Sequence, residues 1–317
     1  MPDVDAIRAR RDAVAERYGP WTSHDIQLAE GLSTRPGGAD LDRLRRCLQI
    51  ATDVLRRPLA ELRVLDLGAL EGQYAVEFAA QGATAVAIEG REANIEKARV
   101  AQEALELDRL ELLHDDVRSL SPDRHGTFDV VLCIGLLYHL DADDVFRFLG
   151  QLAAVCEGVL ILDTHVALRG PSVHVHDGHE YRGLRFAEHD PRASATQRAR
   201  SVWASLDNPE SFWPTRASLL TALMRAGFSS VLSAEVPVAR SPRDRVALVC
   251  LKGPAVTLRS ARPRDPSAVT LPSEQRPPRF VRNQSRLFLL LKRLALRGLV
   301  LRERLARRNR RGGARPS

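Results

Sequence analysis

The sequence predicts an α/β protein whose centre is a doubly wound sheet, preceded by a helical cap and followed by a basic tail. Short apolar runs alternate with helical patterns between residues 61 and 253, and this alternation is typical of a largely parallel sheet with helices on both faces. The first run ends in a glycine-bearing turn that leads into a helix, as the first unit of such a sheet does. Arginine is concentrated only after residue 254.

Residues 1–60 are predicted to form the helical cap, which can act as a lid. Asp5–Tyr18 is charged and rich in alanine, and Leu41–Leu55 has apolar residues at helical spacing until Pro58 ends the pattern. The segment 21–38 between them has no regular pattern and ends in Arg-Pro-Gly-Gly. We therefore expect two helices joined by an irregular connection.

Residues 61–253 are predicted to form the sheet domain, with seven strands and four helices. Apolar runs of strand length predict strands at Arg63–Leu67, Ala85–Ile88, Leu110–Leu113, Phe128–Ile134, Val159–Leu162, Ser230–Ala234 and Val246–Leu251. Helical periodicity predicts helices at Gln73–Ala80, Glu92–Leu107, Ala142–Val155 and Arg216–Ala226. Thr215 is the expected N-cap of the last helix, and Gly227 follows its end. Ligands of such sheets bind at the carboxyl ends of the strands.

An insertion at residues 166–214 is too long for an ordinary connection. Long loops in compact domains are commonly lids or binding elements, so we expect it to cover the acceptor of a reaction. His174, His176 and His179 lie within it and have the residue type of a metal site. We favour lid residues over ligands and predict no metal.

The net charge of +7 comes from the tail. Residues 255–317 hold 16 arginines and one lysine against three acids, whereas the preceding 254 residues carry 30 basic and 37 acidic groups. Residues 254–282 are rich in proline, arginine and serine and predict a linker. Residues 283–317 contain a basic amphipathic pattern, which suits an anionic membrane surface, RNA phosphates or an acidic partner. The alternative is a solvated basic tail.

Cysteine usage indicates a reducing compartment. The four cysteines show no metal-ligand spacing, and three of them lie in apolar runs, which is typical of buried thiols: Cys47, Cys133, Cys156 and Cys250. No apolar segment has the form of a signal peptide or the length of a membrane span. These features predict a cytoplasmic protein, with peripheral membrane contact through the tail as one option.

The turn after the first strand predicts a site for a nucleoside-bearing cofactor. Val64–Gly72 reads as strand, turn and helix start, and Gly68 and Gly72 allow a ligand to approach the backbone. Glu89 ends the second strand, where a carboxylate can bind the two hydroxyls of a ribose. Asp66 stands just before the turn and would repel the pyrophosphate of a dinucleotide but suit a cationic ligand. A dehydrogenase is therefore disfavoured.

The pattern V-L-D-L-G-x-x-x-G followed by Glu89 resembles the S-adenosylmethionine (SAM) site of class I SAM-dependent methyltransferases. The departure is Leu70, where many members carry another glycine. The resemblance extends from about residue 61 to 252 and implies a Rossmann-like, seven-stranded mixed sheet with an antiparallel last strand. It also implies that Asp116, followed by Val117 at the tip of the third strand, bonds the adenine amino group.

The fourth strand and the residues after it, F-D-V-V-L-C-x-G-L-L-Y-H-L, resemble a methyltransferase subgroup that includes the tRNA wobble-uridine carboxymethyltransferases. The segment from Cys133 through Gly135 and Tyr138 to His139 should then border the transferred methyl group. His139 could act as a general base or orient the acceptor. The alternative is that it only caps the helix that begins near Asp141.

Further catalytic and acceptor candidates come from neighbouring segments. Asp163 and His165 end the fifth strand at the same edge of the sheet and are the other catalytic candidates. Trp21 and His24 belong to a segment that resembles the one folding over the SAM pocket in the subgroup, and Trp213 precedes the last helix. We expect these residues, with Tyr138, to bind the acceptor. For Trp203 we expect plain packing.

These observations predict a SAM-dependent methyltransferase that acts on a small-molecule or glycan-like acceptor, at oxygen. One alternative is a tRNA-modifying enzyme that uses the basic tail for RNA, which the acidic body disfavours. Another is a non-catalytic SAM-binding scaffold.

Overall fold

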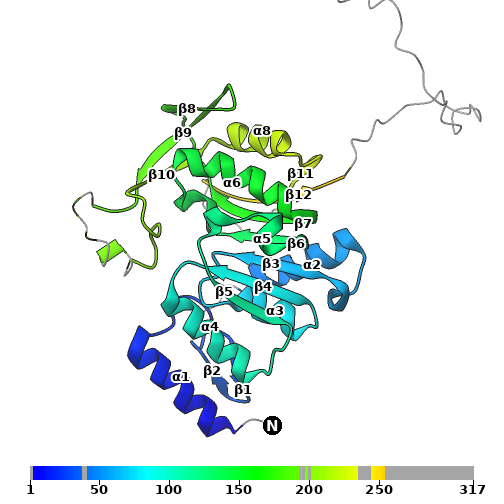
Figure 1. The fold of residues 1–317 in the computed structure, drawn as a ribbon, viewed down its shortest axis with the longest axis vertical. Coiled ribbons are helices and arrows are strands. Elements are labelled where there is room, and N and C mark those ends of the chain that lie inside the picture. The colour runs from blue at the N-terminus through cyan, green and yellow to red at the C-terminus, as the bar shows by residue number, and fades with distance from the viewer. Residues whose placement is uncertain are drawn as a thin grey trace, which may run out of the picture. The chain divides into compact units, whose positions relative to one another are not determined.

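The computed structural model describes residues 3–37, 41–190, 192, 194, 197–198, 201–234 and 244–253. Its centre is a seven-stranded sheet with the order β11-β12-β7-β6-β3-β4-β5 (Figure 1). The strands are β3 (Arg63–Leu67), β4 (Thr84–Glu89), β5 (Leu110–His114), β6 (Phe128–Ile134), β7 (Cys156–His165), β11 (Ser230–Ser233) and β12 (Arg245–Leu251). The predicted linker and basic tail lie outside the described residues.

The pairing of the strands confirms the predicted mixed sheet. β3, β4, β5, β6 and β7 pair in parallel. β12 pairs antiparallel with both β7 and β11, so the last strand reverses the direction of the sheet. Because the five parallel strands all end at the same edge, the residues that follow them converge there.

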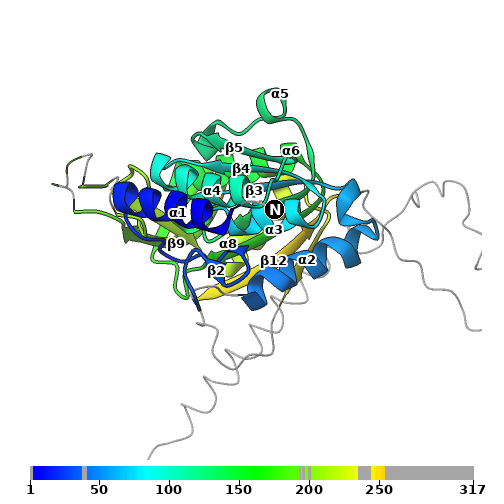
Figure 2. The same cartoon turned by 90° about the horizontal axis from the view of Figure 1, so that it is seen from below.

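Helices cover both faces of this sheet. One face packs against α2 (Leu41–Leu55), α3 (Gln73–Ala80) and α4 (Glu92–Ala104), and the other against α6 (Ala142–Val155) and α8 (Arg216–Ala226). The short helix α5 (Pro122–His125) contacts α6. Figure 2 shows α2 and α6 on opposite sides of the strands. α1 (Val4–Tyr18) packs on α4, so it forms an outer layer on the first face. Single 3-10 turns are at Leu59–Glu61 (η1), Val117–Ser119 (η2) and Leu137–His139 (η3).

Alternation along each strand separates the two apolar layers. Val64 and Val130 pack with α2, whereas Leu65 and Val131 pack with α6, because successive side chains point to opposite faces. All four cysteines are buried and unpaired. The described residues up to Gly253 belong to one compact unit, which holds the described parts of the cap, the sheet and the insertion.

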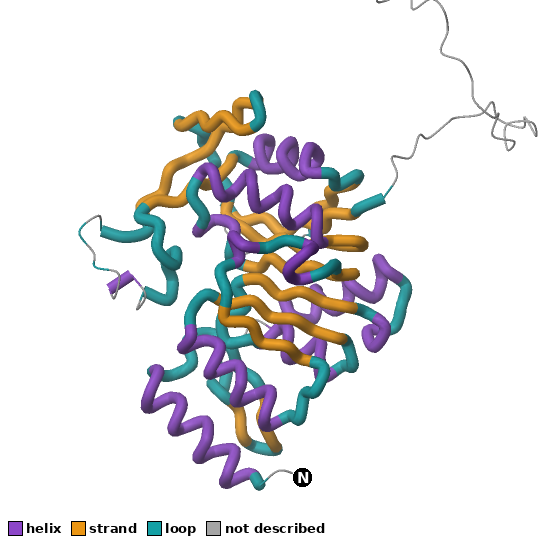
Figure 3. Tube along the Cα trace, viewed as in Figure 1, coloured by secondary structure: helices purple, strands orange, loops and turns teal. Residues whose placement is uncertain are grey.

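The insertion forms a second sheet rather than an irregular loop. β8 (Ser172–His176), β9 (His179–Ala187) and β10 (Glu210–Pro214) pair antiparallel in the order β10-β9-β8. Figure 3 shows this sheet next to α6 and α8, at the opposite end of the main sheet from α1. His174 stacks on Phe146 of α6, with ring centroids 5.3 Å apart. No cluster of metal-ligating side chains occurs among the residues that the structure describes.

Other segments also differ from the prediction, among them β7, which extends three residues beyond the predicted Val159–Leu162 at each end. Residues 21–38 contain a short hairpin of β1 (Gln27–Ala29) and β2 (Leu32–Ser33), and strands of two or three residues are too short to show alternation. α4 ends at Ala104 instead of Leu107, because Glu106 adopts a φ of +51°, outside the helical region. Within the described part of the chain, no helix is long and apolar enough to cross a membrane.

Candidate cofactor and acceptor site

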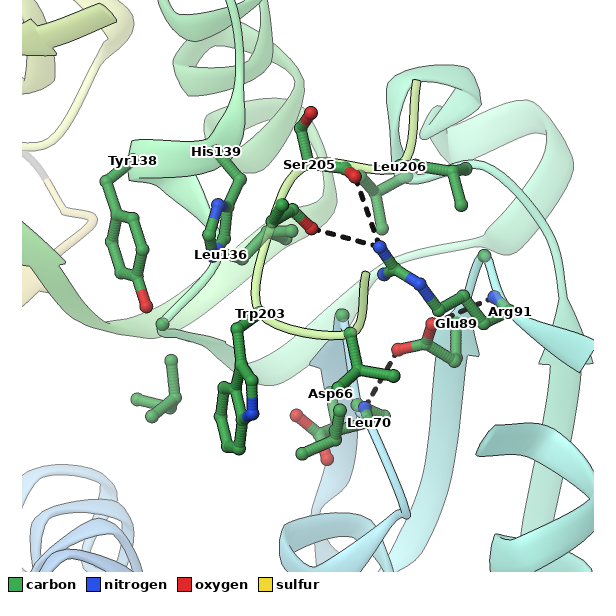
Figure 4. A pocket seen from close by; sticks show the side chains of 18 of the residues that line it. Asp66, Leu70, Glu89, Arg91, Leu136, Tyr138, His139, Trp203, Ser205 and Leu206 are labelled. Carbon is green, nitrogen blue, oxygen red and sulfur yellow. Dashed lines mark hydrogen bonds between the residues drawn. The ribbon is translucent and has the colours of Figure 1, made fainter. Parts of the chain in front are cut away.

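A cavity opens at the edge where the parallel strands end (Figure 4). Four neighbouring strand ends contribute to its lining: Asp66 and Gly68 at β3, Glu89 at β4, Asp116 at β5 and Gly135 at β6. The sequence predicts each of these five residues as part of a cofactor site, and the fold brings them to one cavity.

The turn between β3 and α3 depends on left-handed backbone conformations. Gly68 has a φ of +63°, and a Cβ there would lie 2.9 Å from Leu136 Cδ1. Leu70 has a φ of +51°, which costs a non-glycine residue roughly 1–2 kcal/mol. This conformation is one that favours glycine, the residue that the resemblance implies at this position. The turn is held in place because the Leu70 N–H donates to Glu89 Oε2 at 2.9 Å.

Glu89 is a buried and fixed carboxylate. Its second oxygen accepts the backbone N–H of Arg91 at 2.8 Å. Burial raises the pKa of Glu89, and the two backbone hydrogen bonds oppose this shift. Each carboxylate oxygen retains a further lone pair, so the group is suited to accept two hydrogen bonds from adjacent hydroxyls.

Asp66 lies deeper in the same cavity. Burial raises its pKa to about 7, although a hydrogen bond from the Ala75 N–H opposes the shift. The nearby Glu89 carboxylate raises the pKa further. A neutral ligand would favour the protonated form of Asp66, whereas a cationic ligand would favour the carboxylate.

Asp116 is the third carboxylate at the strand ends. Burial raises its pKa, but hydrogen bonds from Arg118 outweigh burial and the net pKa is lowered. Arg118 donates from its backbone N–H at 2.9 Å and from its guanidinium at 2.6 Å. Leu70, Val117 and Leu206 give the neighbouring wall an apolar surface, against which a purine ring can pack.

The cap segment is anchored to the turn by Glu71, a residue that the sequence analysis missed. Glu71 is fully buried, and its carboxylate accepts the backbone N–H groups of Thr22, Ser23 and His24 at 2.5, 3.2 and 3.1 Å. The Lys97 ammonium lies 3.5 Å away. Ser23 and His24 line the cavity as a result. Burial lowers the pKa of His24 to about 4, with Glu71 opposing the shift, so His24 is neutral at pH 7.

Tyr138 and His139 form the wall beyond Gly135, on η3. The His139 Nδ1 lies 3.0 Å from the Glu188 carboxylate, which comes from the insertion. A carboxylate only accepts hydrogen bonds, so this contact assigns the proton of a neutral His139 to Nδ1. Burial opposes the ionisation of Glu188, but hydrogen bonding and charge from His139 lower its pKa overall. The alternative of a helix cap does not describe this ring, since Asp141 itself caps α6.

The cavity has the groups that SAM requires. Asp66 can face a cationic centre, Glu89 a ribose and Asp116 an exocyclic amine, and the backbone of the glycine turn allows close approach. The match to SAM therefore rests on the chemistry of three carboxylates and on the missing side chain at Gly68.

Residues 64–158 match a family described as a methyltransferase domain. A comparison of the sequence with curated proteins gives no match. Two solved structures of the N-terminal domain of EvdMO1, one with SAH bound and one in the presence of SAH and D-fucose, share 26% and 27% identity with this chain. Both have a TM-score of 0.62 and cover 80% of this chain and 98% of theirs. The chain is a SAM-dependent methyltransferase. A structure of EvdMO1 at 24% identity, with a TM-score of 0.53, covers 77% of this chain and 47% of that one.

Three predicted site residues of the methyltransferase do not line the cavity: Gly72, Cys133 and Trp21. Gly72 begins α3 with a φ of +81°, and a Cβ there would lie 2.8 Å from Ala98 Cβ. Its role is to let α3 and α4 pack closely. Cys133 is fully buried in the layer beneath α6, so its neighbours Ile134 and Gly135 reach the cavity instead. Trp21 is buried in the layer beneath α1.

Asp163, His165 and Trp213 lie behind the wall rather than on it. The Asp163 carboxylate binds the Arg245 guanidinium at 2.6 Å and lies 3.6 Å from Arg43. These two arginines line the cavity, whereas Asp163 does not. His165 stacks on Trp213 at 5.0 Å, and the Trp213 indole donates to the Tyr138 carbonyl at 2.9 Å. His165 and Trp213 therefore support Tyr138 from behind, whereas Asp163 holds the two arginines in place.

Trp203 lies on the cavity wall, although the sequence did not predict it as a site residue. The expectation of plain packing is wrong, because 66% of its surface is exposed and it lines the cavity. The next two residues, Ala204 and Ser205, are buried, whereas the indole of Trp203 faces the open cavity. A tryptophan in a loop carries no periodic signal that could separate these two outcomes.

The raised pKa of Asp66 predicts that SAM affinity depends on pH. Below about pH 7, Asp66 is increasingly protonated in the ligand-free protein. The cationic ligand binds best to the carboxylate form, so Asp66 must release this proton when SAM binds. The Kd for SAM should therefore rise by up to about tenfold for each pH unit below about 7. Calorimetric titration of SAM between about pH 5.5 and 8 measures this dependence over the relevant range. Asp66→Asn should bind more weakly and without that slope. A wild-type Kd that stays constant over the range would contradict the prediction.

Proposed function

We propose that the methyltransferase transfers the methyl group of SAM to a hydroxyl of a small-molecule or glycan-like acceptor. Glu89 would bind the ribose, Asp66 the cationic end and Asp116 the adenine. The observation that carries the choice of oxygen is the contact between His139 and Glu188 at the cavity wall.

This pair has the arrangement of a general base. SAM carries its methyl group on a sulfonium: the acceptor oxygen bonds to the methyl carbon as the C–S bond breaks, and the electron pair stays with sulfur in the neutral thioether SAH, an excellent leaving group. A hydroxyl must lose its proton as it attacks, whereas a neutral amine can attack with its own lone pair. With Nδ1–H donated to Glu188, the lone pair of His139 is on Nε2 and can accept the hydroxyl proton. Glu188 would stabilise the imidazolium that forms.

Two further observations support a sugar-like acceptor. The EvdMO1 N-terminal domain, at 27% identity, has a structure determined in the presence of D-fucose. The wall that carries His139 also has the aromatic Tyr138 and the polar Asn208, whose amide donates to the His139 carbonyl, a mixture that suits a ring bearing several hydroxyls. Contact of residues 283–317 with an anionic membrane or with RNA stays a prediction from their sequence.

The test is transfer of radiolabel from methyl-labelled SAM to a panel of acceptors: free deoxysugars including D-fucose, nucleotide-linked sugars, amines and carboxylic acids. We expect label in the sugar fractions, in a form that resists alkali, because an ether survives where a methyl ester is hydrolysed. His139→Gln protein is the matched control for background transfer. Label that accumulates on amines, or that alkali releases, would contradict transfer to a hydroxyl.

A further inference from the structure

We propose that residues 201–208 form a strap that holds Trp203 against the bound cofactor, and that Arg91 is the residue that positions this strap. The strap belongs to the insertion, more than 100 positions after the cofactor-binding turn in the chain. Six of its eight residues line the cavity, five of them without a break from Val202 to Leu206.

Arg91 connects the strap to the ribose side of the cavity. Its guanidinium donates to the backbone carbonyls of Ser201, Ala204 and Ser205 at 3.1, 2.9 and 3.1 Å. Figure 4 shows Arg91 reaching the strap residues that are drawn there, Ser205 among them. The backbone N–H of the same residue donates to Glu89. One residue therefore contacts both the carboxylate suited to the ribose and the segment across from it.

Two more contacts fix the strap on the other sides of the cavity. Arg118, which holds Asp116, also donates to the Asp207 carboxylate at 2.8 Å. Glu188 Oε2, which contacts His139, accepts the Ser205 N–H at 2.8 Å. The strap is thus tied to the adenine side through Arg118 and to the acceptor side through Glu188.

Close approach of the strap depends on Gly90, between Glu89 and Arg91. A Cβ at this position would lie 2.9 Å from Leu206 Cδ2. The absent side chain lets Leu206 lie over the end of β4, where it adds to the apolar wall.

Trp203 is the strap residue best placed to contact a ligand. Figure 4 shows its indole extending from the strap into the cavity that Asp66 and Tyr138 also line. The Trp203 side chain is large and apolar, and 66% of its surface is exposed. A ligand that covers this surface gains favourable apolar contact. A cofactor between the glycine turn and the strap would cover this surface. The strap would then slow dissociation of the cofactor.

Tryptophan fluorescence with SAH tests the proposal without any acceptor, and so separately from the proposed function. Trp21 and Trp213 are far less exposed than Trp203. SAH should shift the wild-type emission to shorter wavelength, and Trp203→Phe should lose most of that shift. Trp203→Ala should raise the Kd for SAH by about tenfold, the scale of burying part of an aromatic side chain. Leu168→Ala, an equally exposed apolar residue of the insertion, should bind like the wild type.

Arg91→Met keeps the aliphatic stem and removes the Nη2 group that donates to the three carbonyls. We expect faster dissociation of SAH in stopped-flow experiments, a smaller emission shift, and partial recovery of both in Arg91→Lys. Because the Trp203 side chain is exposed, its replacement leaves the core intact and decides the proposal even where Arg91→Met does not fold. The proposal is overturned if Trp203→Phe retains the full shift, or if Trp203→Ala binds SAH as tightly as the wild type.

Discussion

Replacing His139 with glutamine is expected to lower kcat by roughly 10²–10⁴-fold, the usual contribution of general acid–base catalysis, while the Kd for SAM changes little. The glutamine keeps a polar side chain of similar size at the wall, but it cannot take up the proton of a hydroxyl. Steady-state kinetics on the acceptor identified by label transfer, with calorimetry for SAM, separate the two effects.

Two matched variants sharpen this experiment. Glu188→Gln leaves the base in place but weakens its orientation, so we expect a smaller loss of kcat than in His139→Gln. His179→Gln, on the exposed hairpin between β8 and β9, should behave as the wild type. If His139→Gln retained kcat within about threefold, far short of what a general base supplies, His139 would be a wall residue and the argument for oxygen would fail.

The residual activity of His139→Gln is itself informative. Alignment and desolvation can supply roughly 7–11 kcal/mol of the acceleration of a two-substrate reaction, whereas a base that supplies 10²–10⁴-fold contributes about 3–5 kcal/mol. The enclosing elements, including the cap segment and the insertion, are therefore expected to matter at least as much as the base.

The main sheet could be predicted from the sequence because its signals are local. Val64, Val86 and Val130 each lie in a run that is buried on both faces, and each run is followed by a turn and a helical pattern. Parallel strands all end at the same edge of a sheet, so the sequence could place Asp66, Glu89 and Asp116 together at that edge. The insertion offered no such signal, because β8 and β9 are largely exposed and neither contains a buried apolar run.

The residues that sequence analysis missed act across long separations in the chain. Glu71 binds a segment 47–49 positions away, Glu188 contacts a histidine 49 positions away, and Arg91 reaches carbonyls 110–114 positions away. A single acid or arginine has no periodicity that could reveal such a partner. Cys133 was predicted as a cofactor-binding residue because it lies at the correct strand end. Its side chain points into the core instead, because successive side chains of a strand face opposite sides of the sheet.

Replacing Glu89 with glutamine is expected to raise the Kd for both SAM and SAH by about 100-fold. Two hydrogen bonds from ribose hydroxyls to a charged acceptor contribute about 1.5–3 kcal/mol each, and a loss of about 2.7 kcal/mol corresponds to 100-fold. The loss should be similar for SAM and SAH, because the ribose is common to both and only SAM carries the sulfonium charge. Glu92→Gln, three positions later at the start of α4, where Glu92 bonds Tyr18, removes a carboxylate outside the cavity and should bind normally.

Glu89 also accepts the backbone N–H groups of Leu70 and Arg91, so its replacement could act through the turn rather than through a lost contact. The amide of glutamine presents one acceptor and one donor, and the donor would face one of these N–H groups. Thermal unfolding of the ligand-free variant separates the two routes. A lost ribose contact weakens SAH binding with little change in Tm, whereas a disordered turn lowers the Tm as well. A Kd within about threefold of the wild type, less than the loss of one such hydrogen bond, would remove Glu89 from the cofactor site and leave Asp66 and Asp116 as the only carboxylates among the described cavity residues that could hold SAM.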